Sequence, residues 1–329
     1  MMDRVRDILR LIRWPNLLFL AVLMWVLEKW LVVPLLYSHG GLPEVLPDPV
    51  LWMLILSVVL VAAGGYVIND YFDIKIDRIN RPDRVIVGET MSKPAAMHLS
   101  IGLSAAGILM GLLVAWLCRS WTLGIVILLM PGLLWFYSSA YKRQFLVGNL
   151  IVAFASAVVP MLLGLANEGM FLPFILAHDF QPILDQLQPV IRVIYTWLGG
   201  FALMIFLYTW IREVIKDLQD QMGDRELECR TMPIRLGELW TKILLTVMIA
   251  ITIGMLCWFV FGLLPFPHTW NSMSVRYLSF GLIIPLLCVL ALVWAARIPS
   301  DYRNAQRLMK LAMLLGLLYS YVIYIQLCA

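Results

Sequence analysis

The chain has 329 residues, of which 62% are hydrophobic and 14% are charged. Soluble domains are typically about 45–50% apolar and about 25% charged, so this composition does not suit a water-soluble globule. The apolar residues form continuous blocks of roughly 20 residues, which is the length of α-helix that crosses about 30 Å of hydrocarbon. Because polar and apolar residues do not alternate within these blocks, a β-barrel is disfavoured. We therefore expect an all-α polytopic membrane protein.

Nine membrane helices are predicted from these blocks. Their expected bounds, in chain order, are 14–34, 50–68, 97–117, 121–137, 146–166, 191–211, 241–262, 277–296 and 309–327. With the amino terminus inside, 21 of the 25 Lys and Arg residues fall on inside segments. The positive-inside rule therefore predicts an N-in, C-out protein. Small residues at Gly107 and Gly111 are expected to form a helix-packing surface.

Cysteine, histidine and net charge exclude several other classes. The five cysteines never occur at C-x-x-C spacing and the four histidines are scattered, so no zinc or haem signature exists. The net charge of +4 reflects the basic residues of the inside loops. Nucleic acid is therefore not an expected partner, whereas the lipid bilayer is.

Acidic residues are concentrated in two inside segments, 69–96 and 212–240. Together these segments hold 12 of the 21 Asp and Glu residues of the chain. Charge of both signs gathered in two loops of an otherwise apolar protein points to function rather than packing.

The first of these segments carries a stripe of oxygen-bearing side chains. At 100° per residue, five of them fall within an arc about 100° wide on a helix. The five are Asn69, Asp70, Asp73, Asp77 and Asn80. Carboxylates at i,i+3 and i,i+4 repel one another, so such a stripe is favourable when a cation is bound to it.

The second segment repeats this spacing, since Asp217, Asp220 and Asp224 each lie 147 residues after an aspartate of the first. Oxygen ligands without nearby His or Cys select a hard cation, and Mg²⁺ is the best candidate. Mg²⁺ is usually held jointly with substrate phosphates, so we expect a phosphorylated ligand. Inside cations are candidates to bind its remaining oxygens, namely Arg81, Arg84, Lys142, Arg212 and Lys216. For Lys142, simple positive-inside anchoring is the alternative.

Aromatic side chains lie near both acidic segments. Interfacial belts account for most of them. If a phosphate leaves an allylic chain, however, an aromatic face stabilises the resulting positive charge by about 0.5–2 kcal/mol. One or two of the nearby aromatic residues are candidates for this role, the set being Tyr71, Phe72, Tyr137, Tyr141, Tyr208 and Trp210.

The two acidic segments resemble the aspartate-rich motifs of the UbiA-type intramembrane prenyltransferases. The first motif spans 69–84 and reads Asn-Asp-x-x-Asp-x-x-x-Asp-x-x-Asn-Arg-Pro-x-Arg. The second spans 212–233 and contains Lys-Asp-x-x-Asp-x-x-Gly-Asp-Arg. The resemblance extends over essentially the whole chain. It implies a single domain, 1–329, in which nine helices surround a central cavity and the two motifs face each other.

The resemblance also implies an activity, the Mg²⁺-dependent transfer of a prenyl group from a prenyl diphosphate to a membrane-associated acceptor. The implied metal ligands are Asn69, Asp70, Asp73, Asp77, Asp217, Asp220 and Asp224, and Asp73, Asp77, Asp220 and Asp224 are interpreted as catalytic. The implied diphosphate-binding residues are Lys142, Arg81, Arg84, Lys216 and Arg13. Many members place Tyr four residues before the lysine, whereas this chain has Ser138 at that position. Of the aromatic residues, the resemblance therefore singles out the flanking Tyr137 and Tyr141 as candidates to stabilise an allylic cation.

The second motif is more similar to the geranylgeranylglycerol-phosphate branch of the family than to the 4-hydroxybenzoate branch. Geranylgeranyl transfer to a glycerol-phosphate lipid is therefore the first hypothesis, and prenylation of an aromatic quinone precursor is the alternative. A secondary transporter of a phosphorylated lipid or metabolite is the alternative of another class, although transporters more typically place such sites near the bilayer midplane. The expected location is the cytoplasmic membrane, with the site opening to the cytoplasm.

Overall fold

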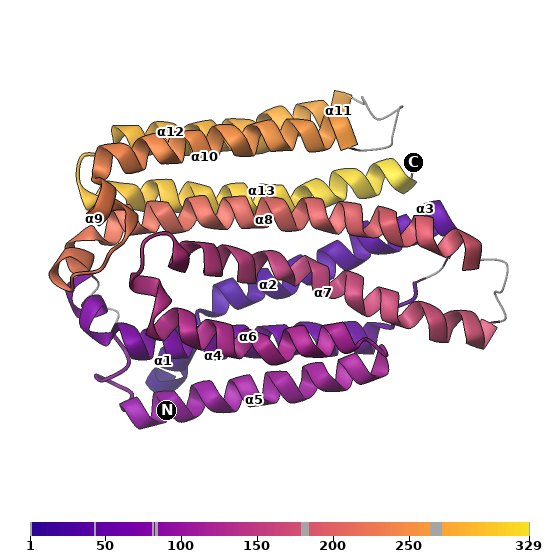
Figure 1. The fold of residues 1–329 in the computed structure, drawn as a ribbon, viewed down its shortest axis with the longest axis horizontal. Helices are drawn as coiled ribbons and strands as arrows, with labels where there is room; N and C mark the ends of the chain where they lie inside the picture. Colours follow the sequence, from indigo (N-terminus) through magenta and orange to yellow (C-terminus); the bar gives the residue numbers. More distant parts are fainter. Residues whose placement is uncertain are drawn as a thin grey trace. The chain divides into compact units, whose positions relative to one another are not determined.

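The computed structural model describes residues 2–42, 44–80, 82, 85–178, 184–263 and 272–328. This part of the chain is almost entirely helical, apart from an isolated β-bridge between Val87 and Met91. Nine helices within it are long and apolar enough to span a membrane (Figure 1). The prediction of an all-α protein with nine membrane helices is confirmed, and the N-in orientation stays a prediction.

The spans are built from long helices, some of them interrupted by π-helical turns. In chain order they are α2 (Trp14–Leu27) with η1 (Glu28–Val32) and α3 (Val33–Gly40), α4 (Asp48–Asn80), α5 (Lys93–Leu117), α6 (Trp121–Ser139), α7 (Val147–His178), α8 (Leu184–Glu226), α10 (Glu238–Trp258) with η5 (Phe259–Leu263), α11 (Ser272–Arg276) with η6 (Tyr277–Ile283) and α12 (Ile284–Ala295), and α13 (Tyr302–Cys328). Short helices connect or precede them: α1 (Met2–Leu11), η3 (Tyr141–Arg143), α9 (Met232–Leu236) and η7 (Pro299–Asp301).

Several helix ends differ from the prediction, and two of them carry the acidic stripes. We expected helices to end at 68 and 211, but α4 continues to Asn80 and α8 to Glu226. The predicted bounds were wrong because hydropathy reports where a helix leaves the hydrocarbon, whereas the backbone hydrogen bonds continue into water. Both acidic stripes therefore lie on regular helix, as the 100° arc requires.

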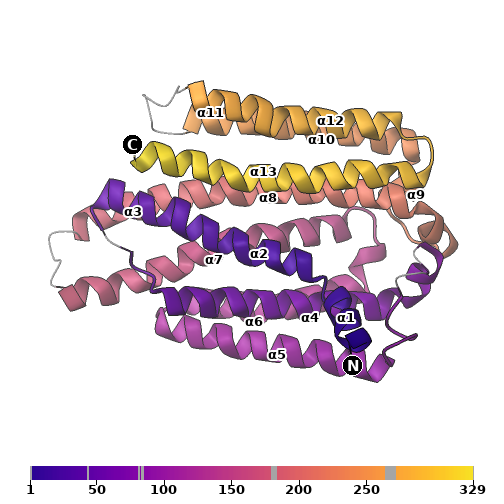
Figure 2. The same ribbon diagram turned by 180° about the vertical axis from the view of Figure 1, so that it is seen from behind.

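The chain forms two compact units. The first unit comprises Met1–Lys142 and Val159–Leu198, and the second comprises Arg143–Val158 and Gly199–Ala329. In the first unit α4, α5 and α6 pack side by side, as both views show (Figure 1 and Figure 2). In the second unit α12 packs against both α10 and α13. That the whole chain is one domain stays a prediction.

Prolines explain two of the π-helical turns. η1 comes directly before the turn that contains Pro34, and η6 directly before the one that contains Pro285. A proline ring clashes with the carbonyl group four residues earlier and offers no N–H to it. The wider π-helical turn before each proline avoids the clash with the proline ring and the need for its N–H, so the membrane span continues.

A buried polar pair joins η1 to α7 within the first unit. Glu28 is fully buried, and its two carboxylate oxygens accept hydrogen bonds of 3.1 and 2.9 Å from Asn167 Nδ2. Asn167 Nδ2 also donates to the Leu163 carbonyl at 3.0 Å. Because a carboxyl group without a partner is costly inside a membrane protein, this pair specifies how the two helices meet.

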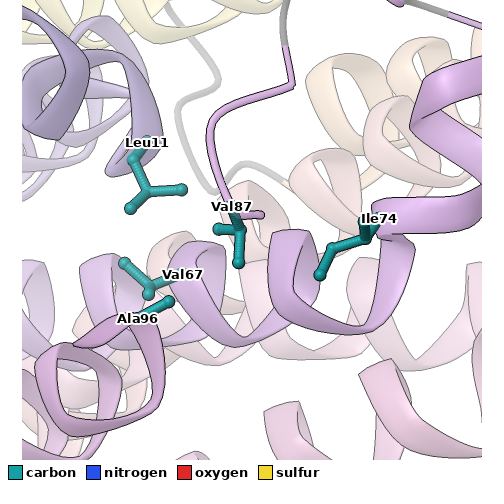
Figure 3. Close-up of a cluster of buried hydrophobic side chains, with 5 residues drawn as sticks. All are labelled: Leu11, Val67, Ile74, Val87 and Ala96. Carbon is teal, nitrogen blue, oxygen red and sulfur yellow. The ribbon is translucent and has the colours of Figure 1, made fainter. Parts of the chain in front are cut away.

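A buried apolar cluster fixes the surroundings of the first acidic motif. Its members are Leu11, Val67, Ile74, Val87 and Ala96 (Figure 3). Val67 and Ile74 lie on α4 on either side of the motif's first acids, while Leu11 ends α1 two residues before Arg13. The cluster therefore positions the α1–α2 junction beside this part of α4.

Small residues allow α4 and α5 to approach closely, as the sequence predicts. Ser57 Oγ donates a 2.7 Å hydrogen bond to the Gly107 carbonyl, and Ser100 Oγ donates a 2.9 Å bond to that of Gly64. A Cβ added at Gly107 would lie 2.9 Å from the Ser57 carbonyl oxygen and 3.0 Å from the Val61 nitrogen. Since both are backbone atoms, the helices would have to separate.

We predict that Gly107→Ala lowers the stability of the protein by about 1–3 kcal/mol, because the interface becomes overpacked. Gly102→Ala on the same helix is the matched control, since a Cβ there meets nothing within 4 Å. Alanine is favoured over glycine in a helix interior by about 1 kcal/mol, so the control should be equally stable or more so. Thermal unfolding in detergent measures both, and equal melting temperatures for the two variants would contradict the interface.

Candidate active site

The first motif forms one face of α4 within the first unit. Asn69 and Asp73 are buried there, with 7% and 4% of their surface exposed, and Asp70 and Asp77 are half-buried. Asn69 Nδ2 donates a 2.8 Å hydrogen bond to Asp73 Oδ2, one turn further along. The predicted stripe of carboxylate and amide oxygens on one face of a helix is therefore present.

Two cations from other elements neutralise this stripe. Arg13 Nη2, at the junction of α1 and α2, lies 2.7 Å from Asp70 Oδ1. Lys142 Nζ, on η3, forms an ion pair with Asp73 Oδ2 and donates to Asn69 Oδ1 at 3.2 Å. Both residues were predicted from the sequence as phosphate-binding cations, and the structure brings both to the first motif.

The charge state of these two cations follows from their carboxylate partners. Burial by itself lowers the pKa of the Lys142 ammonium, but the Asp73 carboxylate more than compensates, so the pKa lies above its ordinary value. Burial likewise lowers the pKa of Arg13, and Asp70 reverses the effect. Both side chains are therefore positively charged at any physiological pH.

The backbone of Arg13 adopts an unusual conformation. Its φ and ψ of 54° and 51° lie in the left-handed region, which non-glycine residues rarely occupy. Such a conformation costs on the order of 1–3 kcal/mol and persists only where neighbouring contacts impose it. Here the guanidinium binds Asp70 and also lies 4.9 Å from the centre of the Tyr66 ring. Sequence reasoning missed Tyr66, whose signal was its position one turn before Asp70 on the motif helix.

The two tyrosine candidates occupy different environments. Tyr137 is buried, with 9% of its surface exposed, and lies five residues before Lys142 in the chain. Tyr141 is 37% exposed. Ser138, which replaces the tyrosine of many family members, donates a hydrogen bond of 2.9 Å to Leu134 O on its own helix. The geometry favours Tyr137 as the aromatic group at the site.

The second motif lies on α8 within the second unit. Asp217 Oδ2 accepts a 2.8 Å hydrogen bond from Asn149 Nδ2 of α7, and Asp224 Oδ2 accepts a 3.0 Å bond from Thr231 Oγ1. Asp220 is half-buried on the same helix. Asn149 and Thr231 were not predicted as site residues, because uncharged side chains in the flanking sequence carry no strong chemical signal.

The cations of the second motif share one carboxylate. Arg212 Nη2 lies 2.5 Å from Glu213 Oε1, and Lys216 Nζ lies 3.4 Å from Glu213 Oε2. Glu213 itself is buried, with 4% of its surface exposed. The expected phosphate-binding Lys216 is therefore held at the motif helix by an acid that was not predicted as a site residue.

The remaining predicted cations, Arg81 and Arg84, lie outside the described residues. Among the residues that are described, no three His, Cys, Asp or Glu side chains form a ready metal-binding group. The donor set still fits Mg²⁺, because this ion commonly takes one or two protein carboxylates together with water and substrate phosphates. The contact between Asn69 and Asp73 shows that these oxygen-bearing side chains do converge.

Comparison with known sequences identifies close similarity over most of the chain. The model of the UbiA prenyltransferase family matches residues 30–314. A digeranylgeranylglyceryl phosphate synthase of Methanopyrus kandleri is 32% identical over 259 residues, which are 79% of this chain and 82% of the relative. The synthase of the same name from Methanosarcina barkeri is 30% identical over 320 residues, covering 95% and 96% of the two chains.

Solved structures share the fold. A structure from work on digeranylgeranylglyceryl phosphate synthase in membranes superposes with a TM-score of 0.62 at 20% identity, covering 98% of this chain and 99% of the other. A UbiA homologue from Archaeoglobus fulgidus bound to GPP and Mg²⁺ gives a TM-score of 0.55 at 13% identity, covering 96% and 99%. At these identities the similarity is one of fold.

We predict that Lys142→Gln destabilises the protein by roughly 1–3 kcal/mol, because Asp73 is left buried with its ammonium partner removed. The double variant Asp73→Asn with Lys142→Gln should recover part of this loss, since it leaves no charge behind. Lys75→Gln is the control, because Lys75 is an exposed lysine on α4, the helix that carries Asp73. Thermal unfolding of the purified variants tests this, and a Lys142→Gln variant as stable as the control would show that the ion pair contributes nothing.

Proposed function

Since this chain belongs to the UbiA prenyltransferase family and is an integral membrane prenyltransferase, we propose that it transfers a geranylgeranyl group from its diphosphate to a glycerol-phosphate lipid. The observation that carries the proposal is the cluster of Asp70, Asp73, Arg13 and Lys142, which combines oxygen ligands for a hard cation with donors for phosphate. The choice of lipid acceptor is supported by relatives named digeranylgeranylglyceryl phosphate synthase that are at least 30% identical over most of this chain. In the reaction the allylic C–O bond breaks, its electron pair leaves with diphosphate, and a hydroxyl oxygen of the acceptor bonds to the allylic carbon and loses its proton.

We assign the Mg²⁺ ligands to carboxylate and amide side chains of the two motifs. They are Asn69, Asp70, Asp73 and Asp77 on α4, and Asp217, Asp220 and Asp224 on α8. When bound, Mg²⁺ neutralises negative charge that develops on the departing diphosphate. Oxygen-only donors and the absence of histidine or cysteine from both stripes support this ion over zinc or iron.

Lys142 and Arg13 are proposed to bind the diphosphate directly, with Lys216 and the arginines Arg81 and Arg84 as further contributors. An ammonium has three N–H donors and a guanidinium has five, so a cation paired with one carboxylate keeps donors for phosphate oxygens. Lys142 uses two donors on Asp73 and Asn69, and Arg13 uses one nitrogen on Asp70. The remaining donors hold the leaving group next to the acids.

Tyr137 is proposed as the aromatic group that stabilises the allylic cation. A cation over an aromatic face gains about 0.5–2 kcal/mol, more when water is excluded. The choice of Tyr137 is supported by its burial and by its position five residues before Lys142, whereas Tyr141 is partly exposed. The transporter interpretation is set aside, because the family to which the chain belongs is one of enzymes.

We predict that Asp73→Asn and Asp220→Asn each reduce Mg²⁺-dependent diphosphate release by at least about 100-fold, the usual scale for losing a group that stabilises transition-state charge. Glu226→Gln is the control, because Glu226 lies on the same helix as Asp220 but is exposed and outside the motif spacing. The assay uses purified protein, geranylgeranyl diphosphate, and either geranylgeranylglyceryl phosphate or 4-hydroxybenzoate. Unchanged turnover in Asp220→Asn would refute the two-motif mechanism, and turnover with the aromatic acceptor alone would refute the lipid acceptor.

We also propose that the protein lies in the cytoplasmic membrane with its amino terminus and its site facing the cytoplasm. Cysteines introduced at Ser92 and Ser300, in a background without the five native cysteines, should react with an impermeant thiol reagent only from the inside. A cysteine at Ser38 should react only from the outside. The reason is the excess of Lys and Arg on the segments that contain Ser92 and Ser300. Labelling is compared between intact cells, which expose the outside, and inverted vesicles, which expose the inside. A reversed labelling pattern would refute the proposed orientation.

A further inference from the structure

The second unit contains an open pocket of about 460 Å³ that none of the assigned site residues lines. It is formed by the segment that leaves η3, by the segment that follows α8, and by the end of α9. The lining residues are Arg143, Gln144, Phe145, Glu228, Arg230 and Arg235. Three guanidinium groups against one carboxylate give the pocket a net positive charge.

The walls of this pocket are held together by specific contacts. The backbone N–H of Arg230 donates a 2.9 Å hydrogen bond to the Arg143 carbonyl, which joins the two segments. The Arg235 guanidinium lies 5.5 Å from the centre of the Phe145 ring, a distance at which a cation is attracted to the aromatic face. Arg143 and Arg235 therefore have defined positions although both are exposed.

The three arginines have no acidic partner among the residues that the structure describes. No carboxylate in those ranges lies within 4.0 Å of their guanidinium nitrogens, although Glu228 lines the same pocket. A guanidinium is always charged and presents a planar fork of donors that matches two phosphate oxygens. Converging guanidinium groups without a carboxylate partner are typical of a site that receives an anion from outside the protein.

The pocket is connected to the second motif through one short segment. The Cys229 N–H donates to the Asp224 carbonyl at 2.9 Å, and the Thr231 hydroxyl donates to the Asp224 carboxylate at 3.0 Å. Arg230 lies between these two anchors. A ligand held by Arg230 is consequently within one residue of a side chain that touches the motif.

We propose that this pocket binds a phosphate monoester, and that the phosphate is the head group of the lipid acceptor. The inference rests on the proposed function, because it assigns the acceptor's phosphate to residues different from those that bind the prenyl diphosphate. The same chemistry would also recognise a soluble glycerol phosphate, so the test includes both sources.

Binding is measured by calorimetry in detergent with EDTA and without prenyl diphosphate, so that the readout does not depend on turnover. The ligands are geranylgeranylglyceryl phosphate, the corresponding alcohol without phosphate, and glycerol phosphate. The wild-type protein should bind the phosphate lipid at least tenfold more tightly than the alcohol. In the double variant Arg230→Gln with Arg235→Gln this preference should fall to about threefold or less.

Arg297→Gln is the matched control, since Arg297 is an exposed arginine of the same unit that does not line the pocket. It should keep the wild-type preference. If the double variant is too unstable to measure, the single variant Arg143→Gln is tested in its place. Its preference for the phosphate lipid over the alcohol should be several-fold smaller than that of the wild-type protein. In turnover assays the variants should raise KM for the acceptor and leave KM for the prenyl diphosphate unchanged.

A wild-type protein without a preference for the phosphate lipid, or a folded double variant that keeps that preference, would overturn the proposal. Glycerol phosphate binding as tightly as the lipid would support a phosphate site but identify its ligand as soluble. Failure of the proposed function is distinguishable, because prenyl transfer to geranylgeranylglyceryl phosphate would then be absent while the binding preference of the pocket remained measurable.

Discussion

Negative charge at the end of a membrane-spanning helix is the constraint on which this arrangement depends. Asp73 is 4% exposed and lies on the helix that also carries the apolar residues of a membrane span. An ionised carboxylate in such a place is unfavourable unless a cation or several donors bind it. Lys142 and Asn69 meet this requirement for Asp73, and Arg13 meets it for Asp70. The elements that supply these partners are thereby required to converge on α4.

The two acidic stripes have the same spacing but are neutralised in different ways. In the first unit, cations from outside the motif contact the acids directly. In the second unit, Asp217 and Asp224 accept from a neutral amide and a neutral hydroxyl, while the nearby cations Arg212 and Lys216 bind Glu213. The same spacing in sequence therefore gives the acids of the two stripes different hydrogen-bond partners.

The segment after α8 links two chemical tasks. Residues 229–231 anchor on Asp224 through a backbone N–H and a hydroxyl group, and Arg230 between them faces the arginine-lined pocket. Arg230 is proposed to bind the phosphate of the acceptor, and its segment is held to Asp224, a proposed metal ligand. The position of the acceptor is thereby coupled to that of the acids. These contacts limit displacement of the acceptor from its reactive position, and reaction rates fall steeply with such displacement.

Much of the fold followed from the sequence, because transfer into hydrocarbon is a local property of each segment. The nine spans, the helical stripe of Asn69, Asp70 and Asp73, and the proximity of Lys142 and Arg13 to it were all predicted. The ends of α4 and α8 were not, because hydropathy measures insertion and not helix length. The roles of all the predicted metal ligands and diphosphate-binding cations stay predictions, and Arg81 and Arg84 lie outside the described residues.

Tertiary structure alone decided which groups are partners. Arg13 and Asp70 are 57 residues apart, Lys142 and Asp73 are 69 apart, and Asn149 and Asp217 are 68 apart. The left-handed backbone of Arg13 and the burial of Tyr137 also have no sequence signal of their own. Composition and spacing determined the kinds of group present, since these depend on neighbours along the chain. Their pairing depends on the distances between helices, which only packing of the whole unit establishes.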